Sequence, residues 1–308
     1  MLDFRLKVFY TVAKRLSFTK AAAELFITQP AVSKHIHELE QQLSTALFER
    51  KGNQISLTPA GQITLRHAEA ILATYRQLEY DLNALKGQYA GLLRLGASST
   101  VAQYVIPPVL ARFHQQYADV NVSLLNGNTQ QIEHELLSKD IELGIVEGRT
   151  RHHDIRYTSF VQDEIVLVAK ADHPLAGRDE ITLDELKAQP LLLRERGSGT
   201  LEVIEYALRQ VGVRLTDLTV EMYLGSTESI KAYLTQSSCL ALVSVYAVKN
   251  ELQAGVLRVL DVEGLTIRRD FYAIQLQGAN EQLAETFLRF ARRHYADLTQ
   301  PGMRKDRH

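Results

Sequence analysis

Residues 17–43, SFTKAAAELFITQPAVSKHIHELEQQL, decide the fold of the first part of this chain. Thr28 is a candidate helix N-cap, because a hydroxyl before an apolar periodic run accepts a hydrogen bond from a free backbone N–H. The apolar residues after it recur every three or four positions, on one helix face: Val32, Ile36, Leu39 and Leu43. Residues 19–25 indicate a shorter helix just before it. Two short helices with so short a connection are typical of a helix-turn-helix.

The flanking segments extend this unit in both directions. Residues 6–16 carry the stripe of a preceding helix, made of Leu6, Phe9, Ala13 and Leu16. The runs 47–50 and 54–57 are strand-like and surround a Gly-Asn turn, a pattern that predicts a hairpin. We therefore expect an all-α-type winged helix-turn-helix domain over residues 1–58, with the hairpin as its wing.

A long linker helix is predicted over residues 59–89, because Thr58 and Pro59 form a cap followed by a first-turn proline. Its apolar residues follow each other at spacings of three and four: Ala68, Ile71, Tyr75, Leu78, Leu82 and Leu85. Such a heptad seam favours pairing with a second helix, so we expect a dimerisation helix. Periodicity leaves one alternative open, in which the helix packs against its own domain.

From residue 92 the hydrophobic period changes to strand-like runs that alternate with helical ones. The strand-like runs are 92–97, 120–125, 141–146, 165–169, 191–193, 219–223, 240–243 and 271–276. This alternation predicts an α/β domain with mainly parallel sheets covered on both faces. We expect that domain over 90–303, with lobe I over 90–161 and 268–303, lobe II over 162–267, and a disordered tail over 304–308.

Composition excludes several classes of protein. The 308 residues include one cysteine, Cys239, which excludes an internal disulfide and a paired-cysteine zinc site. No segment has the apolar run of an export signal or of a membrane span, so we expect a cytoplasmic protein with no membrane partner. The net charge is −1, but residues 1–60 hold 8 Lys+Arg against 5 Asp+Glu, a local +3 that permits nucleic-acid binding.

The third helix presents its polar face outward if its apolar stripe faces the core. The first turns of a recognition helix reach base edges in the major groove, where Gln29 can pair with adenine and Pro30 can touch a thymine methyl. Basic and hydroxyl side chains nearby suit phosphates. The candidate DNA-contacting residues are Ser17, Thr19, Thr28, Gln29, Pro30, Ser33, Lys34, His37, Arg50 and Lys51. An ordinary three-helix unit with a solvated polar face is the alternative.

Longer motifs favour DNA binding over that alternative. The residues Ala21-Ala22, Leu25, Thr28 to Ser33, Ile36, Leu39-Glu40, Leu47 to Arg50 and Leu57 to Gly61 resemble the N-terminal signature of LysR-type transcriptional regulators. One departure is Ser44, where the family usually has glycine. The resemblance implies a homodimer or homotetramer that binds an interrupted palindrome in double-stranded promoter DNA, with RNA polymerase as a candidate partner. Since the sequence also lacks the motifs of enzymes and of metal sites, we expect no enzyme activity, no catalytic residues, no cofactor and no metal.

Three Ser/Thr-rich segments, 97–100, 197–200 and 224–227, each follow a predicted strand and precede a helix. Helix N-termini at the carboxyl ends of strands bind anions, and Arg194 and Arg196 add positive charge. Helix capping alone is the alternative for each segment. The candidate effector-binding residues are Ser98, Ser99, Thr100, Asn128, Thr129, Arg194, Ser198, Gly199, Thr200, Ser226 and Thr227.

The family resemblance implies that an effector binds between two lobes similar to those of periplasmic binding proteins. Residues 193–200, LRERGSGT, look like the branch that controls cysteine or sulfite metabolism and carbon fixation. We therefore expect a small anion: a sulfur oxyanion, a small carboxylate or a phosphate ester. A second departure lies at 236–240, where relatives more often carry glycines. Cys239 in that segment is expected to be a buried hydrophobe, with a redox sensor as the alternative.

Two rival functions, an enzyme and a solute-binding protein, fit the sequence less well. An enzyme would need a nucleophile elbow, a phosphate loop, a dinucleotide fingerprint or a zinc motif, and the sequence has none of these. The adjacent His152 and His153 are interpreted as an exposed loop. A periplasmic solute-binding protein would explain two α/β lobes, but it predicts an export signal and no helix-turn-helix.

Overall fold

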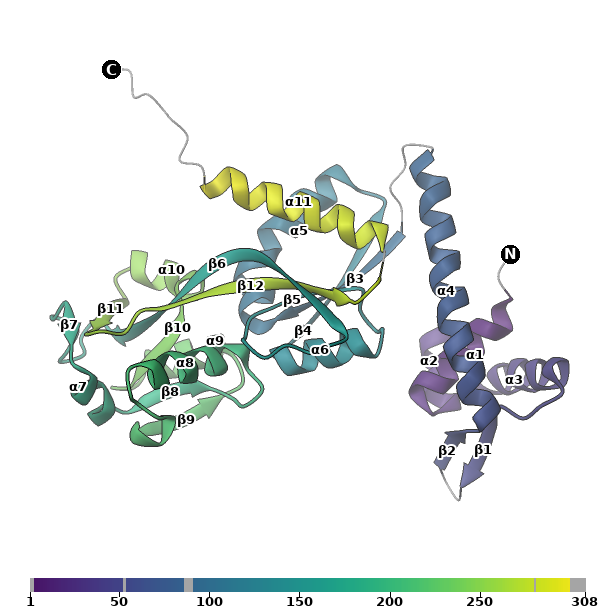
Figure 1. The fold of residues 1–308 in the computed structure, drawn as a ribbon, viewed down its shortest axis with the longest axis horizontal. Helices are drawn as coiled ribbons and strands as arrows, with labels where there is room; N and C mark the ends of the chain where they lie inside the picture. The colour runs from purple at the N-terminus through teal and green to yellow at the C-terminus, as the bar shows by residue number, and fades with distance from the viewer. Residues whose placement is uncertain (1–2, 52–53, 86–90, 280, 300–308) are drawn as a thin grey trace, which may run out of the picture. The chain divides into compact units, whose positions relative to one another are not determined.

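The computed structural model describes residues 3–51, 54–85, 91–279 and 281–299 (Figure 1). The chain divides after residue 88 into two compact units, each described by itself. The predicted tail over 304–308 lies outside the described residues, as does the predicted end of the linker helix over 86–89. None of the helices in the described ranges is long and apolar enough to cross a membrane.

The first unit contains three short helices, a hairpin and a long helix. In chain order these are α1 (Phe4–Arg15), α2 (Phe18–Leu25), α3 (Gln29–Leu43), β1 (Phe48–Lys51), β2 (Gln54–Leu57) and α4 (Pro59–Leu85). The predicted caps are present: the side chains of Ser17 and Thr28 accept bonds from Lys20 N (3.3 Å) and Ala31 N (3.4 Å). These caps stop and restart the helix within a few residues, which produces the helix-turn-helix.

The core of this unit contains most of the predicted stripe residues, including Phe9, Val32 and Ile36. Leu6 is partly buried against this core, and two predicted stripe residues are exposed. Leu16 and Leu43 are 49% and 45% exposed, because Leu16 is the left-handed C-cap of α1 and Leu43 is the last residue of α3. A residue at a helix end lies beyond the partners that bury the middle of the stripe. Ser44 follows with φ +51°, the left-handed conformation for which glycine is usually chosen.

The helix α4 carries its predicted apolar seam with unequal burial. Ala68 is fully buried in the core of the first unit, as the alternative interpretation required. Farther along, Ile71, Leu78 and Leu82 are 46%, 51% and 50% exposed. The second half of the seam therefore lacks apolar cover within the described part of the chain, and large exposed apolar side chains at helical spacing are typical of a helix-pairing surface.

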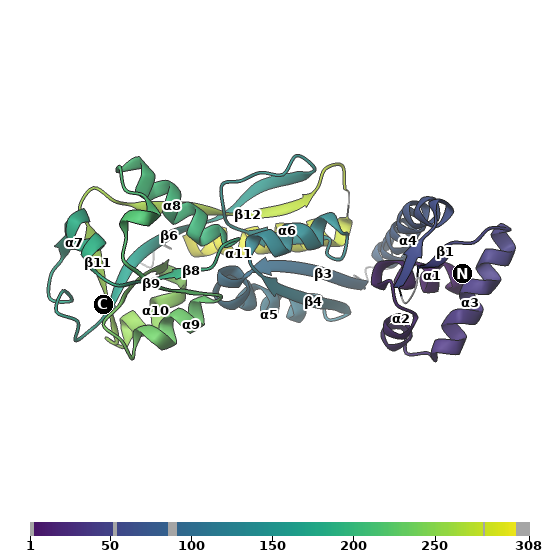
Figure 2. The ribbon, with the colours of Figure 1, turned by 90° about the horizontal axis from the view of Figure 1, so that it is seen from below.

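The second unit is a mixed ten-stranded sheet covered by helices (Figures 1 and 2). Its elements are β3 (Gly91–Ser98), a short π-helix η1 (Val101–Val105), α5 (Ile106–Gln116), β4 (Val120–Gly127), α6 (Thr129–Leu137), β5 (Leu143–Val146), β6 (Ile155–Lys170), β7 (Glu180–Ile181), α7 (Leu183–Ala188), β8 (Leu191–Arg194), α8 (Gly199–Gln210), a 3-10 turn η2 (Leu215–Asp217), β9 (Val220–Leu224), α9 (Thr227–Leu234), β10 (Leu240–Ser244), α10 (Val245–Gln253), β11 (Leu257–Val262), β12 (Ile267–Leu276) and α11 (Gln282–Thr299).

The prediction of mainly parallel sheets is wrong at the centre of this unit. The strand order is β4-β3-β5-β12-β6-β10-β8-β9, and the long central strands β6 and β12 run antiparallel to each other and to their neighbours β10 and β5. Residues 147–154 form no helix, so β6 is not reached by the helical crossover that a parallel neighbour needs. The predicted strand at 165–169 is the end of β6, which begins at Ile155, and the short strands β7 and β11 were not predicted.

Separate cores lie along β6 and β12, and two of them mark the two ends of the domain. Val161 and Phe271 belong to the core that packs β3, α5 and α11, whereas Ile165 and Ile267 belong to the core that packs β8, β10 and α8. Figure 1 shows the two long strands running between these halves, which we call half A (with β3) and half B (with β8). The residue bounds predicted for the two lobes stay a prediction.

Candidate functional site

The predicted recognition helix is α3, and its polar residues lie at its exposed N-terminal end. Gln29, Pro30, Lys34 and His37 are exposed and Ser33 is half-buried. The Gln29 amide donates to Ser33 Oγ at 2.9 Å, so these two side chains lie together one turn apart. The arrangement offers a donor and acceptor pair at the start of a helix, which is where base-reading helices carry their contacts.

The other candidate DNA contacts surround this helix start. Thr19 and Thr28 are exposed, while Ser17 is half-buried and caps α2. Lys34 lies 3.9 Å from Glu38, a loose ion pair that leaves the ammonium exposed. The side chains of Arg50 and Lys51, at the end of β1, lie outside the described part of the structure.

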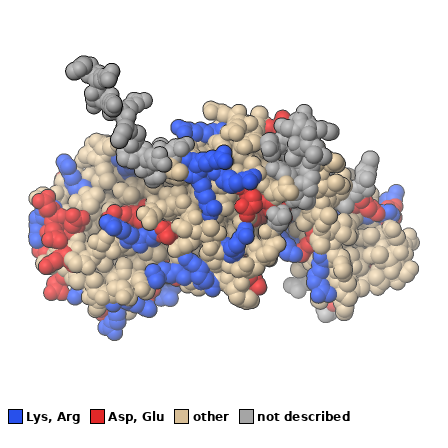
Figure 3. All heavy atoms as spheres, turned by 45° about the horizontal axis from the view of Figure 1, so that its top comes forward, with Lys and Arg blue, Asp and Glu red and all other residues tan. Residues whose placement is uncertain are grey.

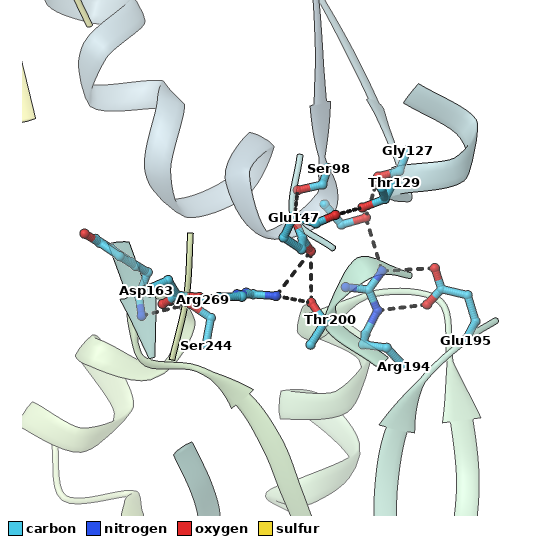
Figure 4. A network of polar contacts seen from close by, with 12 residues as sticks. Ser98, Gly127, Thr129, Glu147, Asp163, Arg194, Glu195, Thr200, Ser244 and Arg269 are labelled. Carbon is cyan, nitrogen blue, oxygen red and sulfur yellow. Dashed lines mark hydrogen bonds and ion pairs between the residues drawn. The ribbon is translucent and has the colours of Figure 1, made fainter. Parts of the chain in front are cut away.

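In the second unit, the Ser/Thr residues at strand ends come together in a buried network of polar contacts between the halves, a region that we call the cleft (Figure 4). They include residues from β3, from the start of α6 and from the start of α8, all less than 9% exposed: Ser98, Ser99, Thr100, Thr129, Ser198 and Thr200. The convergence follows from topology, because β3 and β5 of half A and β8 of half B end at this point. The sequence predicted this gathering from strand ends alone.

Glu147, which was not predicted, is the centre of this cleft. Its carboxylate accepts bonds from Ser98 Oγ and from Thr200 Oγ1 (2.9 Å), and its backbone carbonyl accepts from Thr129 Oγ1 (2.8 Å). Glu147 comes directly after the buried strand β5 and is 2% exposed. Its position directly after an apolar strand could have identified Glu147 from the sequence, since that strand ends at the same edge of the sheet as the Ser/Thr segments.

A second buried charge cluster joins Glu147 to the long strands. Arg269 of β12 donates to Asp163 Oδ2 (2.7 Å) and to Thr200 Oγ1 (2.8 Å), and lies 3.6 Å from Glu147. Burial raises the pKa of the Asp163 carboxyl, an effect that the Arg269 charge opposes. Asp163 and Arg269 also line an open groove of about 670 Å³. Neither residue was predicted as a site residue, because Asp163 lies beside Glu164 and Arg269 lies between Arg268 and Asp270, so no local pattern shows which of these charges is buried.

Arg194 is the most deeply buried cation of the cleft, with 1% of its surface exposed. Its Nε and Nη2 donate to the two carboxylate oxygens of Glu195, at 2.8 and 3.0 Å, and Nη2 also reaches Ser99 Oγ at 3.4 Å. Its third nitrogen, Nη1, and the hydroxyl of Ser198 are buried and make no hydrogen bond within the described structure. Buried polar groups without a partner are rare and costly, so these two atoms are candidates for contact with a ligand, as is Arg269 Nη2 of the adjoining cluster, which is also buried without a partner.

Capping explains part of the predicted site. Ser226 accepts from Ser229 N at 3.1 Å as the N-cap of α9, and Asn128 forms a capping box with Gln131 at the start of α6. Thr227, which follows this cap, is buried. The segment before the cap contacts the cleft, because Arg194 Nη2 donates to Gly225 O at 3.3 Å. Ser198, by contrast, is the N-cap of α8 and makes no side-chain capping bond. The capping alternative therefore accounts for Ser226 but not for Ser198.

Close approach of the halves requires the predicted Gly199. A Cβ at this position would lie 2.1 Å from Glu147 O and 2.6 Å from Thr129 Oγ1, so only glycine fits. Contacts on either side also join the halves: Thr150 donates to Glu202 through both N and Oγ1 (2.7 and 2.6 Å), and the Tyr104 hydroxyl donates to Glu228. Burial, followed by that bond, raises the pKa of Tyr104.

Among the described residues, the cleft holds two cations, Arg194 and Arg269, and three carboxylates, which belong to Glu147, Asp163 and Glu195. On the face of the second unit seen in Figure 3, Lys and Arg side chains gather near the upper middle, and Asp and Glu side chains gather at the left end. Cys239 is buried, at 4% exposure, which suits a small hydrophobe. The ligand atoms of His152, His153 and Asp154 lie within 4.8 Å of one another in a loop where His153 is exposed, an arrangement common without a metal.

Comparison with known proteins identifies the family. Residues 4–62 match the model of the bacterial regulatory helix-turn-helix protein, lysR family, and residues 86–296 match the LysR substrate binding domain. The HTH-type transcriptional regulator CysL of Bacillus subtilis is 30% identical over 264 residues, covering 86% of this chain and 87% of the relative. The RuBisCO operon transcriptional regulator of Allochromatium vinosum is 33% identical over 274 residues, covering 89% of each.

A solved structure is similar to the second unit. The Synechocystis PCC6803 CcmR regulatory domain in complex with 2-PG is 30% identical, with a TM-score of 0.61, and covers 66% of this chain and 97% of that one. The relatives match both branches that residues 193–200 suggested. The chain therefore belongs to the LysR family of bacterial transcriptional regulators, with a helix-turn-helix unit and an effector-binding domain, and is neither an enzyme nor a periplasmic solute-binding protein.

Proposed function

We propose that this regulator reads promoter DNA with the start of α3 and responds to a small anion bound in the cleft at Arg194. The observation that carries the second part is the buried Arg194 Nη1, which has no hydrogen-bond partner in the described structure. A guanidinium N–H buried without an acceptor costs about 1–3 kcal/mol or more, and a carboxylate, phosphate or sulfate oxygen would satisfy it.

The start of α8 supports the same ligand. Its first backbone N–H groups receive no side-chain cap from Ser198, whose hydroxyl is itself unpartnered. Unbonded N–H groups and the positive end of the helix dipole favour an anion. The CcmR regulatory domain, similar in fold to this unit, was solved with 2-PG. For this chain we propose the wider class of small oxyanions, carboxylates and phosphate esters.

A panel of ligands tests the anion proposal. We expect sulfate, inorganic phosphate or 2-PG to raise the melting temperature of the full chain, because a ligand at 100 times its Kd adds about 2.7 kcal/mol of stability. Thermal unfolding at constant ionic strength, with glycerol as the uncharged control, measures the effect. A panel in which every anion leaves the melting temperature at the glycerol value contradicts an anionic effector.

The assembly we propose is a homodimer, or a homotetramer formed from two such dimers, paired through α4. The half-exposed Ile71, Leu78 and Leu82 supply the apolar surface. Two heads related by symmetry suit an interrupted palindrome. We place this assembly in the cytoplasm, with RNA polymerase as a further partner.

Regulation follows if the anion favours one arrangement of the two halves over another. A ligand shifts such an equilibrium only by its differential affinity for the two states. We propose that the shift changes how the two DNA heads are spaced on the promoter. Footprinting with and without the anions of the panel tests this, and identical footprints under saturating anion would count against it.

Substitutions in α3 test the recognition helix. We expect Gln29→Ala and Ser33→Ala each to weaken binding to a DNA fragment from beside the regulator's own gene by about 1–3 kcal/mol, the usual value of a base contact. Gln42→Ala, an exposed residue near the other end of the same helix, is the matched control and should leave affinity unchanged. Fluorescence anisotropy at one fixed salt concentration measures all three. Unchanged affinity and sequence preference in the two α3 variants would show that another surface reads the DNA.

A further inference from the structure

Arg194 and Glu195 are consecutive residues whose side chains nevertheless face each other. Successive side chains of a strand point to opposite faces, so this pair requires the chain to turn directly after β8. The turn is present: Ser198 N donates to Glu195 O at 3.2 Å, and Gly197 has φ +86°, a left-handed conformation that favours glycine. Local backbone geometry therefore aims the Glu195 carboxylate back at the guanidinium.

The contact has the geometry with which an arginine holds an anionic ligand. Glu195 Oε2 accepts from Nε and Oε1 from Nη2, which is the two-bond, side-on arrangement of guanidinium with carboxylate or phosphate. Oε1 also accepts from Asn128 Nδ2 of half A at 3.3 Å, and Gln130 N of half A donates to Gly197 O at 3.3 Å. The carboxylate thus joins half B to half A. Figure 4 shows its two bonds to Arg194.

The two partners differ in their access to water. The Arg194 side chain is 1% exposed, whereas that of Glu195 is 25% exposed. Glu195 can therefore swing toward solvent, while the guanidinium stays in the cleft and needs another anion in its place. An unpaired buried charge is strongly unfavourable, so departure of Glu195 and arrival of an external anion are linked.

We propose that the Glu195 carboxylate occupies the place on Arg194 that the effector anion takes when it binds. This inference rests on the proposed anion site. An external carboxylate or phosphoryl group must either displace Glu195 from Arg194 Nε and Nη2, or bind Arg194 Nη1 while the negative charge of Glu195 repels it. In either case the charge of Glu195 sets the affinity for the effector. The favoured ligands are anions with two oxygens on one atom, able to replace both contacts.

Neutralising Glu195 tests the proposal. We expect Glu195→Gln to bind sulfate, inorganic phosphate or 2-PG at least roughly ten-fold more tightly than wild type, because a like charge at contact distance is removed. Glu195→Ala should change affinity in the same direction. Isothermal titration of the full chain measures both, with circular dichroism to verify folding. Glu221→Gln is the matched control, since Glu221 is an exposed carboxylate of the same half that lies at the other end of β9 from the position paired with Arg194. It should leave the anion affinity unchanged.

The opposite result has a distinct meaning. If Glu195 only positions Arg194, both variants will bind the anion more weakly than wild type or equally well, and the proposal is overturned while the anion site stands. Failure of both variants to fold would also overturn it, because Glu195 would then be a structural residue. If neither wild type nor the variants bind any anion of the panel, the proposed anion site itself is wrong.

Discussion

Arg194→Met is expected to abolish the stabilisation of this regulator by anions, with affinity falling at least roughly 100-fold. The expectation follows from burial: losing one partner of a fully desolvated charge contact costs about 2–5 kcal/mol. Arg194 has 1% of its surface exposed and holds the unpartnered Nη1, so no bulk water can replace it. Thermal shift and isothermal titration with the anion panel measure the loss.

Arg196→Met is the matched control for this experiment. Arg196 lies two residues along the chain and is exposed, so its loss should leave anion affinity within about three-fold, as is usual for a screened surface charge. Arg194→Met also leaves the Glu195 carboxylate without its partner, so the double variant Arg194→Met/Glu195→Gln separates lost stability from lost binding. Retained anion affinity in a folded Arg194→Met protein would place the ligand elsewhere.

Gly199→Ala is expected to destabilise the effector-binding domain by about 3 kcal/mol or more, at the upper end of overpacking costs. The added Cβ would lie 2.1 Å from a backbone carbonyl oxygen, Glu147 O, and backbone cannot move aside as a flexible side chain would. Relief of the clash requires half A and half B to separate at the cleft, so anion binding should be lost as well.

The control for the steric argument is Gly177→Ala. A Cβ at Gly177 meets nothing within 4 Å, and no left-handed φ is recorded there, so this change should leave the melting temperature nearly unchanged. Differential scanning calorimetry of both variants separates the local clash from the general effect of replacing glycine. A Gly199→Ala protein as stable as wild type would mean that the halves do not pack as closely as this structure has them.

Much of the DNA-binding unit was predictable because its signals are local. The cap residues Ser17 and Thr28 lie within four residues of the N–H groups that they satisfy, and Val32 and Ile36 mark the buried face of α3 by spacing alone. These interactions need no partner distant in the sequence. The errors occur where that locality ends: Leu16 continues the stripe in sequence, but the helix stops there and leaves it exposed.

The cleft was predictable only in part. Ser98 and Thr200 could be placed at strand ends, and the resemblance of residues 193–200 to one branch of the family pointed to an anion. Ser226 illustrates the limit, because a hydroxyl that caps a helix and one that awaits a ligand look the same in sequence. Only the bonds made in the folded chain show that Ser226 is occupied and Ser198 is not.

By itself, the sequence determined the helix-turn-helix, the wing, the long helix and the family, since each depends on residue periodicity, short-range caps or contiguous motifs. Tertiary structure alone decided that β6 and β12 pair antiparallel, that Arg269 meets Asp163 and Glu147, and that Glu195 turns back onto Arg194. The physical reason is that the strand pairing and the Arg269 contacts join residues about a hundred positions apart, while the Glu195 contact depends on a left-handed turn. The free energy that selects these contacts comes from burial in the whole domain. No local sequence pattern therefore reveals them.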